Sequence, residues 1–284
     1  MLRPAPNHPP LPAVTALLDH PAVQGGAAPL VVALVVAAIF ARTRLAWIAM
    51  LAAYATMVAL TTGFALSPLT AARKTILVGL AAPVVGLVLD MLPRATKTVV
   101  TATSVAAGAV SIWIFMSILH QREGATAIAM GGGIALFVAI LVGLTLRLRS
   151  DGLRAGAAGL GLGLATGIAG FLSASIGYLL AGVSIAAGAG ALLLTQVLLS
   201  RKLAAGFLGT LTIGLLTALF AVGSVLLAEL HWYALPLLLL VPLAVTLRAP
   251  ERLPLIVRAA VLAAYALIAA ALPILVAWFA PRGS

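Results

Sequence analysis

The chain has 284 residues, of which 63% are hydrophobic and only 8% are charged. Because soluble domains are about a quarter charged, this composition excludes an ordinary water-soluble globule. The net charge of +11 would suggest nucleic-acid binding in a soluble protein. Here the basic residues lie at the ends of long apolar stretches, so we exclude nucleic acid and predict an integral membrane protein.

The N-terminal residues 1–24 are rich in proline and lack the charged and apolar regions of a secretory signal. We expect them to form an extracytoplasmic segment. Nothing after them is polar enough or long enough to form a separate soluble domain. Residues 25–284 are therefore predicted to form a single transmembrane domain.

Ten apolar stretches, bounded by charged or turn residues, are predicted to be transmembrane helices. They cover residues 25–41, 45–66, 75–92, 98–119, 125–146, 153–172, 176–199, 203–228, 232–247 and 259–280. Most are long enough to cross about 30 Å of hydrocarbon, and helices satisfy their own backbone in lipid. The uncharged stretch 153–199 is too long for one crossing, so we place a turn at Ser173-Ala174-Ser175. The predicted fold is all-α and polytopic, with about ten helices arranged as five hairpins.

Five clusters of basic residues recur along the chain, one pair of predicted helices apart. They begin at Arg42, Arg94, Arg147, Arg201 and Arg248. All five fall in connections on the same side of the predicted bundle. Because short cytoplasmic loops carry excess Lys and Arg, this side is predicted to be cytoplasmic and both termini extracytoplasmic. The expected location is a bacterial-type inner (plasma) membrane.

The spacing of these clusters is also compatible with an internal repeat. Arg42-Thr43-Arg44 resembles Arg147-Leu148-Arg149 at an offset of 105 residues, and Gly63-Phe64 resembles Gly170-Phe171 at 107. A parallel repeat of four helices with an appended hairpin would produce this pattern. Any series of helices with short loops gives similar spacing, so the repeat stays an alternative.

Glycines in the predicted sixth helix share one face. Gly159, Gly163 and Gly167 are four residues apart, and missing side chains there would let another helix approach closely. We interpret this stripe as a helix-packing face. The alternative is a sliding element in an alternating-access transporter.

Four residues are candidates for a substrate path. Asp90 is the single acid inside a predicted span, and Gln196 is an isolated polar residue at a similar depth. Pro236 and Pro242 interrupt the short ninth span, where free backbone carbonyls could line a site. An interfacial ion pair is the alternative role for Asp90, and prolines also occur in membrane helices without a direct role.

Imidazoles and carboxylates gather in connections on the predicted outer side. His120 and Glu123 follow the fourth helix, whereas Glu229 and His231 precede the ninth. Such groups can bind a divalent metal or relay protons, so a metal site is a further hypothesis. Their spacing matches no recognised metal motif, and no particular cofactor is indicated.

No arrangement of residues indicates an enzyme, because the chain has no cysteine, no paired embedded acids and no zinc-protease helix motif. The scarcity of embedded charge favours a permease for a small neutral or lipophilic solute. Two alternatives remain: a non-catalytic anchor or assembly subunit of a larger complex, and a membrane subunit that binds a metal or redox cofactor at its outer face. The expected partners are the lipid bilayer and either another membrane protein or further copies of the chain.

Overall fold

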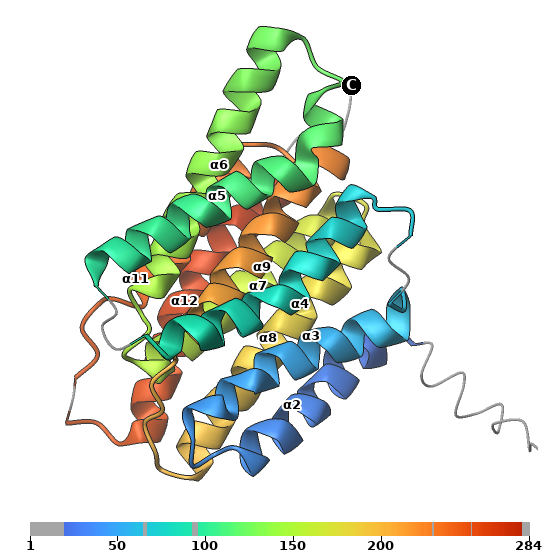
Figure 1. The fold of residues 1–284 in the computed structure, drawn as a ribbon. Helices are drawn as coiled ribbons and strands as arrows, with labels where there is room; N and C mark the ends of the chain where they lie inside the picture. Colours follow the sequence, from blue (N-terminus) through green and yellow to red (C-terminus); the bar gives the residue numbers. More distant parts are fainter. Residues whose placement is uncertain (1–19, 65–66, 93–95, 229, 251, 280–284) are drawn as a thin grey trace, which may run out of the picture.

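A computed structural model describes residues 20–64, 67–92, 96–228, 230–250 and 252–279 (Figure 1). All secondary structure in these ranges is helical. Seven helices are long and apolar enough to cross a membrane. They are α4 (Ala71–Asp90), α5 (Lys97–Leu119), α6 (Gly124–Leu146), α7 (Gly152–Leu172), α8 (Ile176–Leu198), α9 (Gly206–Leu227) and α12 (Leu255–Phe279). The prediction of an all-α, multi-pass membrane protein is confirmed at this level.

Three shorter apolar segments coincide with the first, second and ninth predicted spans. The π-helical turn η1 (Val23–Ala27) continues into α2 (Ala28–Ile39), and the 3-10 turn η2 (Arg44–Trp47) continues into α3 (Ile48–Thr61). The ninth span consists of α10 (Ala234–Leu238) and α11 (Leu240–Ala244). Pro242 has no N–H to bond to the carbonyl four residues earlier, which explains the interruption between them.

The turn predicted at Ser173-Ala174-Ser175 is confirmed. α7 ends at Leu172 and α8 begins at Ile176. Ala174 takes a left-handed conformation with φ of 64°, and the Ser175 N–H donates to the Gly170 carbonyl at 3.1 Å. This hydrogen bond closes a tight turn, so α7 and α8 form a hairpin whose connection contains no charged residue.

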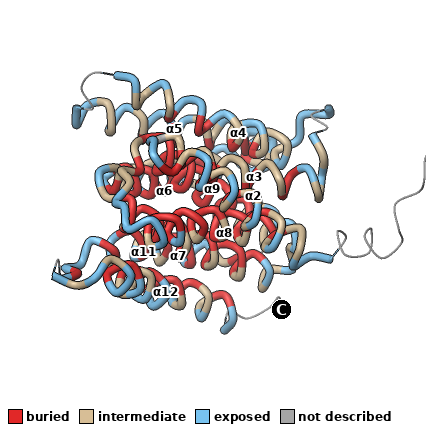
Figure 2. The backbone as a smooth tube through the Cα atoms, turned by 90° about the horizontal axis from the view of Figure 1, so that it is seen from below, coloured by how far each residue is buried: buried red, intermediate tan, exposed pale blue. Residues whose placement is uncertain are grey.

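Helices α7, α8 and α9 form the centre of the bundle (Figure 2). In their most apolar windows, 72%, 61% and 83% of residues are buried, compared with 28–33% in α4, α5, α6 and α12. Exposed residues lie mainly on the outward faces of α4, α5 and α12 in Figure 2. Helices that are buried all round belong to the core, whereas those with an apolar exposed face are suited to lipid.

The central helices approach each other closely through glycine. A Cβ atom added to Gly163 would lie 2.7 Å from the Gly182 carbonyl oxygen, and one added to Gly167 would lie 3.0 Å from that of Leu179. At Gly159 it would lie 2.9 Å from the Ala189 Cβ. The structure thus places all three predicted packing glycines against α8, where close contact stabilises helix association in lipid.

The helices run along one common direction, which gives the bundle two distinct ends (Figure 1). The connections α2–α3, α4–α5, α6–α7, α8–α9 and α11–α12 lie toward the lower left of Figure 1, and we call this the basic end. Exposed cations there include Arg42, Arg147 and Arg201. At the opposite end lie the α3–α4, α5–α6 and α7–α8 connections.

Candidate solute cavity

A cavity of about 350 Å³ lies between α3, α4, α8 and α9, in the half of the bundle away from the basic end. Its lining residues are Tyr54, Met57, Val58, Thr61, Thr62, Ala72, Thr75, Ile76, Phe115, Ser175, Gly177, Tyr178, Leu180, Ala181, Phe220 and Leu227. Gly177 and Leu227 are exposed at the end of the bundle, whereas Phe115 and Tyr54 are fully buried. The cavity therefore extends from the end opposite the basic one toward the middle of the bundle.

Three aromatic rings form the deep wall of this cavity. The Phe220 ring centroid lies 5.9 Å from that of Tyr54 and 6.2 Å from that of Tyr178. Glycines provide the space for the two tyrosines: a Cβ at Gly79 would lie 2.7 Å from Tyr54 Cε1, and one at Gly223 would lie 2.5 Å from the Tyr178 hydroxyl oxygen. The two tyrosine rings thus pack directly against backbone at Gly79 and Gly223, where the neighbouring helices have no side chain.

The Tyr54 hydroxyl is buried and has no hydrogen-bond partner among the described residues. A buried polar group without a partner costs on the order of 1–3 kcal/mol, so the Tyr54 side chain would be stabilised by any hydrogen-bonding group that reached its hydroxyl. Thr61 and Thr75 donate to backbone carbonyls one turn earlier, at 2.8 and 3.0 Å, and their oxygens remain able to accept. All the lining residues are uncharged. The cavity can therefore hold a neutral molecule with an apolar body and a hydrogen-bonding group.

The cavity is closed toward the basic end by the same face of α3 that carries Tyr54. Met50 in α3 and Trp47 at the end of η2 precede Tyr54 at helical spacing, and both are fully buried. The Met50 sulfur would lie 3.0 Å from a Cβ at Gly188, and the Trp47 ring fills the space beside Gly209. The Trp47 indole N–H is a second buried group without a partner in the described part of the chain.

At the basic end, Asp90 holds the start of α9. Its two carboxylate oxygens accept from the Phe207 and Leu208 N–H groups at 2.8 and 3.0 Å. Gly206 permits this approach, because its φ is +63° and an added Cβ would collide with the carboxylate. A carboxylate on the free N–H groups of a helix N-terminus is favourable both as a hydrogen-bond acceptor and as a charge.

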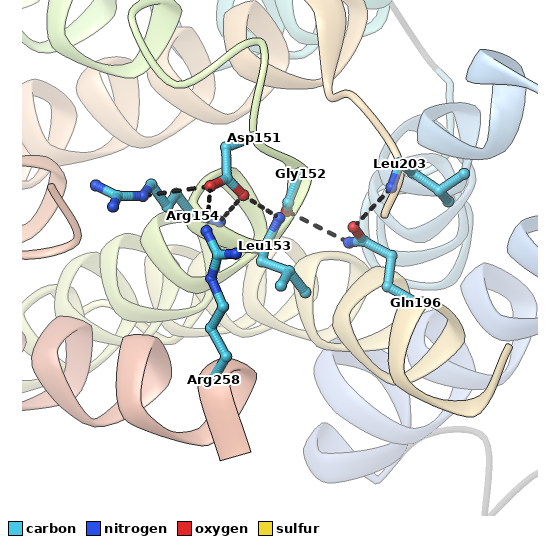
Figure 3. A network of polar contacts seen from close by, with 7 residues as sticks. All are labelled: Asp151, Gly152, Leu153, Arg154, Gln196, Leu203 and Arg258. Atoms are coloured by element: carbon cyan, nitrogen blue, oxygen red, sulfur yellow. Dashed lines mark hydrogen bonds and ion pairs between the residues drawn. The ribbon is translucent and has the colours of Figure 1, made fainter. Parts of the chain in front are cut away.

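A second polar network joins α7, α8 and α12 at the same end (Figure 3). Asp151 caps α7 by accepting from the Leu153 and Arg154 N–H groups at 3.1 and 3.2 Å. Its other oxygen lies 3.1 Å from Arg258 Nη2 and 3.3 Å from Arg154 Nε. The network therefore ties the first turn of α7 to the first turn of α12.

Gln196 extends this network across to α8 (Figure 3). Its amide nitrogen donates to the Gly152 carbonyl at 3.3 Å, and its amide oxygen accepts from the Leu203 N–H at 3.1 Å. Gln196 is fully buried, so these bonds satisfy groups that would otherwise be costly in the interior. Its side chain fixes the α8–α9 connection against α7.

No protein-family model matches this chain, and no curated protein matches it as a relative. Its function must therefore be inferred from the cavity and the networks themselves.

The structure places the predicted substrate-path residues away from the Tyr54 cavity. Asp90 and Gln196 lie at the basic end, where each binds backbone groups. Pro236 borders a separate apolar cavity of about 440 Å³ between α6, α9 and α10, and Pro242 is buried in α11. None of the four lines the cavity to which Tyr54 belongs.

The predicted outer metal site gains no support from the described residues. His120 and Glu123 are exposed beside α6, and the His231 ring centroid lies 5.1 Å from that of Tyr233, with the ring planes tilted by 47°. Glu229 lies outside the described residues. Within the described ranges, no three His, Asp or Glu side chains gather in a group that could hold a metal ion.

Sequence reasoning missed Tyr54, Tyr178 and Asp151. The two tyrosines could have been identified from the sequence, because a phenol hydroxyl in an otherwise apolar helix needs a polar partner. Asp151 could also have been identified, because it directly precedes a predicted helix start, where a capping residue is expected.

Proposed function

We propose that this protein is a permease of a bacterial-type inner membrane for a small neutral solute that is largely apolar and carries a hydrogen-bonding group. The observation that supports this most directly is an uncharged cavity lined by Tyr54, whose buried hydroxyl has no partner among the described residues. Small-molecule sites are typically concave and apolar, with a few polar groups that orient the ligand. A charged solute would find no counter-charge among the lining residues.

The proposed topology has ten crossings, in which the three shorter apolar segments span together with the seven long helices. The basic end then faces the cytoplasm according to the distribution of Lys and Arg. In this orientation the cavity would open to the outside, as we expect for an outward-facing state of a permease. The parallel repeat of four helices stays an alternative, and the proposed mechanism does not depend on it.

Transport requires the closed half of the bundle to open, and α3 is the element best suited to move. Its inner face meets α8 and α9 at Gly188 and Gly209 through van der Waals contacts of Met50 and Trp47. By contrast, Asp90, Asp151 and Gln196 fix the starts of α9, α7 and the α8–α9 connection. Trp47 precedes Tyr54 by seven residues and lies about 10 Å from it toward the basic end. Its unpaired N–H would offer a second hydrogen bond to a solute moving inward.

Binding can be tested with a pair of neutral probes that differ by one hydroxyl, 1-naphthol and naphthalene. We expect the purified full-length protein to bind 1-naphthol more tightly, because naphthalene leaves the Tyr54 hydroxyl unpaired. Tyr54→Phe should reduce the ratio of the two affinities about fivefold, which corresponds to the loss of one neutral hydrogen bond. Tyr265→Phe in α12, outside the cavity, is the matched control. Equal binding of both probes by the wild type would contradict the proposal.

Movement of α3 can be tested by accessibility, since the chain has no native cysteine. A cysteine at Met50, which is 1% exposed, should react slowly with an impermeant maleimide in inside-out vesicles, and 1-naphthol should alter the rate. A cysteine at the exposed Thr43 should react under all conditions. A packed scaffold would leave the cysteine at position 50 unreactive with and without the probe.

Purification from native membranes with mass spectrometry distinguishes the permease from an anchor or assembly subunit. A single species that retains a neutral small molecule supports the permease. This molecule should be lost in Ala72→Trp, which fills the cavity mouth, and retained in Ala125→Trp on the exposed face of α6. A stoichiometric protein partner and an empty cavity would instead support the subunit hypothesis.

A further inference from the structure

A groove of about 520 Å³ lies between the ends of α2 and α8 at the basic end. Its lining residues are Leu34, Ala38, Ile39, Ala41, Arg42, Thr195, Leu198, Leu199 and Arg201. Its two charged members are both arginines, and they follow the last turns of the two helices. The rest of the lining is apolar except for Thr195, whose hydroxyl donates within its own helix at 2.8 Å.

The groove changes character along its length. Its apolar walls run back along α2 from Ile39 to Leu34, toward the middle of the bundle, whereas Arg42 and Arg201 lie at its mouth. Ile39 and Leu198 are 69% and 77% exposed, so they face the surroundings of the bundle beside the arginines. This layout, with charge at the membrane surface and apolar walls below it, matches the layout of a phospholipid.

Both arginines extend from ordered backbone. The Arg201 N–H donates to the Gln196 carbonyl at 3.0 Å, and Ser200 before it adopts a left-handed φ of 50°. After α2, the Thr43 N–H and hydroxyl donate to the Phe40 carbonyl at 2.9 and 3.0 Å. The guanidinium groups are thus carried on defined turns on either side of the groove.

The groove has no internal counter-charge. No carboxylate lines it, and neither Arg42 nor Arg201 forms an ion pair with any residue that the structure describes. Guanidinium groups bind phosphate through paired N–H donors more effectively than a point charge does. The site therefore combines a positive mouth suited to an anion with an apolar floor suited to hydrocarbon.

We propose that this groove binds an anionic phospholipid, with the phosphate at Arg42 and Arg201 and an acyl chain against α2 and α8. The proposal depends on the membrane embedding of the chain and not on the proposed transport function. One occupant satisfies both halves of the groove. A free phosphate would leave the apolar walls without a partner, and an uncharged lipid would leave the guanidinium groups without one.

The test is native mass spectrometry of the full chain, purified in mild detergent and offered phosphatidylglycerol, cardiolipin or phosphatidylcholine. We expect retention of anionic lipid and little retention of phosphatidylcholine. Arg42→Ala/Arg201→Ala should weaken retention of anionic lipid roughly 30-fold, about fivefold per charge. The control Arg147→Ala/Arg252→Ala removes two exposed cations at the same end and should retain lipid as the wild type does.

A second variant tests the apolar half without changing charge. Ala38→Trp fills the groove and should reduce retention of anionic lipid while Arg42 and Arg201 remain. Equal retention of anionic and zwitterionic lipids by the wild type would overturn the proposal, as would equal losses in the groove and control pairs. Competition by millimolar inorganic phosphate, or copurification of an acidic protein at this site in place of lipid, would also overturn it.

Discussion

Asp151 at the start of α7 and Arg258 at the start of α12 form an ion pair of 3.1 Å. They are 107 residues apart in the sequence. The Arg258 side chain is 10% exposed and that of Asp151 is 29% exposed, so the pair is shielded from water on one side. Because Asp151 also caps α7, one carboxylate both begins a core helix and holds the last helix beside it.

Removal of Asp151 should therefore destabilise the protein more than removal of Arg258. Asp151→Ala deletes the cap and leaves a buried guanidinium without its counter-charge, a loss of about 2 kcal/mol after screening is considered. Arg258→Met keeps most of the packing and should cost about half as much. Thermal unfolding in detergent, followed by tryptophan fluorescence, gives the order of stability.

The ion pair also predicts that the stability losses of the two substitutions do not add. The double variant Asp151→Ala/Arg258→Met should be less destabilised than the sum of the two single changes, because Arg258→Met already removes the unpaired charge. Arg154→Met, which removes the more exposed partner, should have little effect. Additive losses would show that the two residues act independently.

Asp90 should behave as a helix cap rather than as a coupling group. Asp90→Ala loses both bonds to the start of α9 and should lower stability by about 1–2 kcal/mol, whereas Asp90→Asn keeps one acceptor and should lose less. Neither change should weaken 1-naphthol binding. A normally stable Asp90→Asn protein that has lost this binding would restore the substrate-path hypothesis.

The course of the helices could be predicted from the sequence because lipid leaves the backbone few alternatives. α5 was expected over 98–119 and occupies Lys97–Leu119, and α8 was expected over 176–199 and occupies Ile176–Leu198. Prediction was less accurate for the first span, where η1 precedes a short α2. A local π-helical turn has no hydropathy signal, so it could not be anticipated.

The site was harder to predict than the fold because it depends on contacts between distant residues. Asp90 was recognised as unusual and placed near the basic end, yet its partners at Phe207 and Leu208 lie more than a hundred positions away. The space for Tyr54 depends on Gly79 in another helix. Single-sequence periodicity reports which face of a helix is apolar, but it does not report which helix covers that face.

Close packing of α7 on α8 predicts a strong effect at Gly182. A Cβ there would collide with the Gly167 backbone and lie 2.6 Å from the Gly163 carbonyl oxygen. Gly182→Ala should therefore force the two helices apart at a cost of about 1–3 kcal/mol. Gly132→Ala is the matched control, because Gly132 is exposed in α6 with no neighbouring atom within 4 Å. Unfolding midpoints that fall equally in both variants would contradict this account of the core.

The proposed orientation can be tested with single cysteines, since the native chain contains none. Thr43 and Ser150 are exposed at the basic end, and His120 is exposed at the opposite end. In intact cells, cysteines at 43 and 150 should be shielded from an impermeant maleimide, and one at 120 should react, if the basic end faces the cytoplasm as we propose from its excess Lys and Arg. Permeabilised cells control for reactivity, since all three positions should then be labelled. The reverse pattern would invert the topology and make the Tyr54 cavity open toward the cytoplasm.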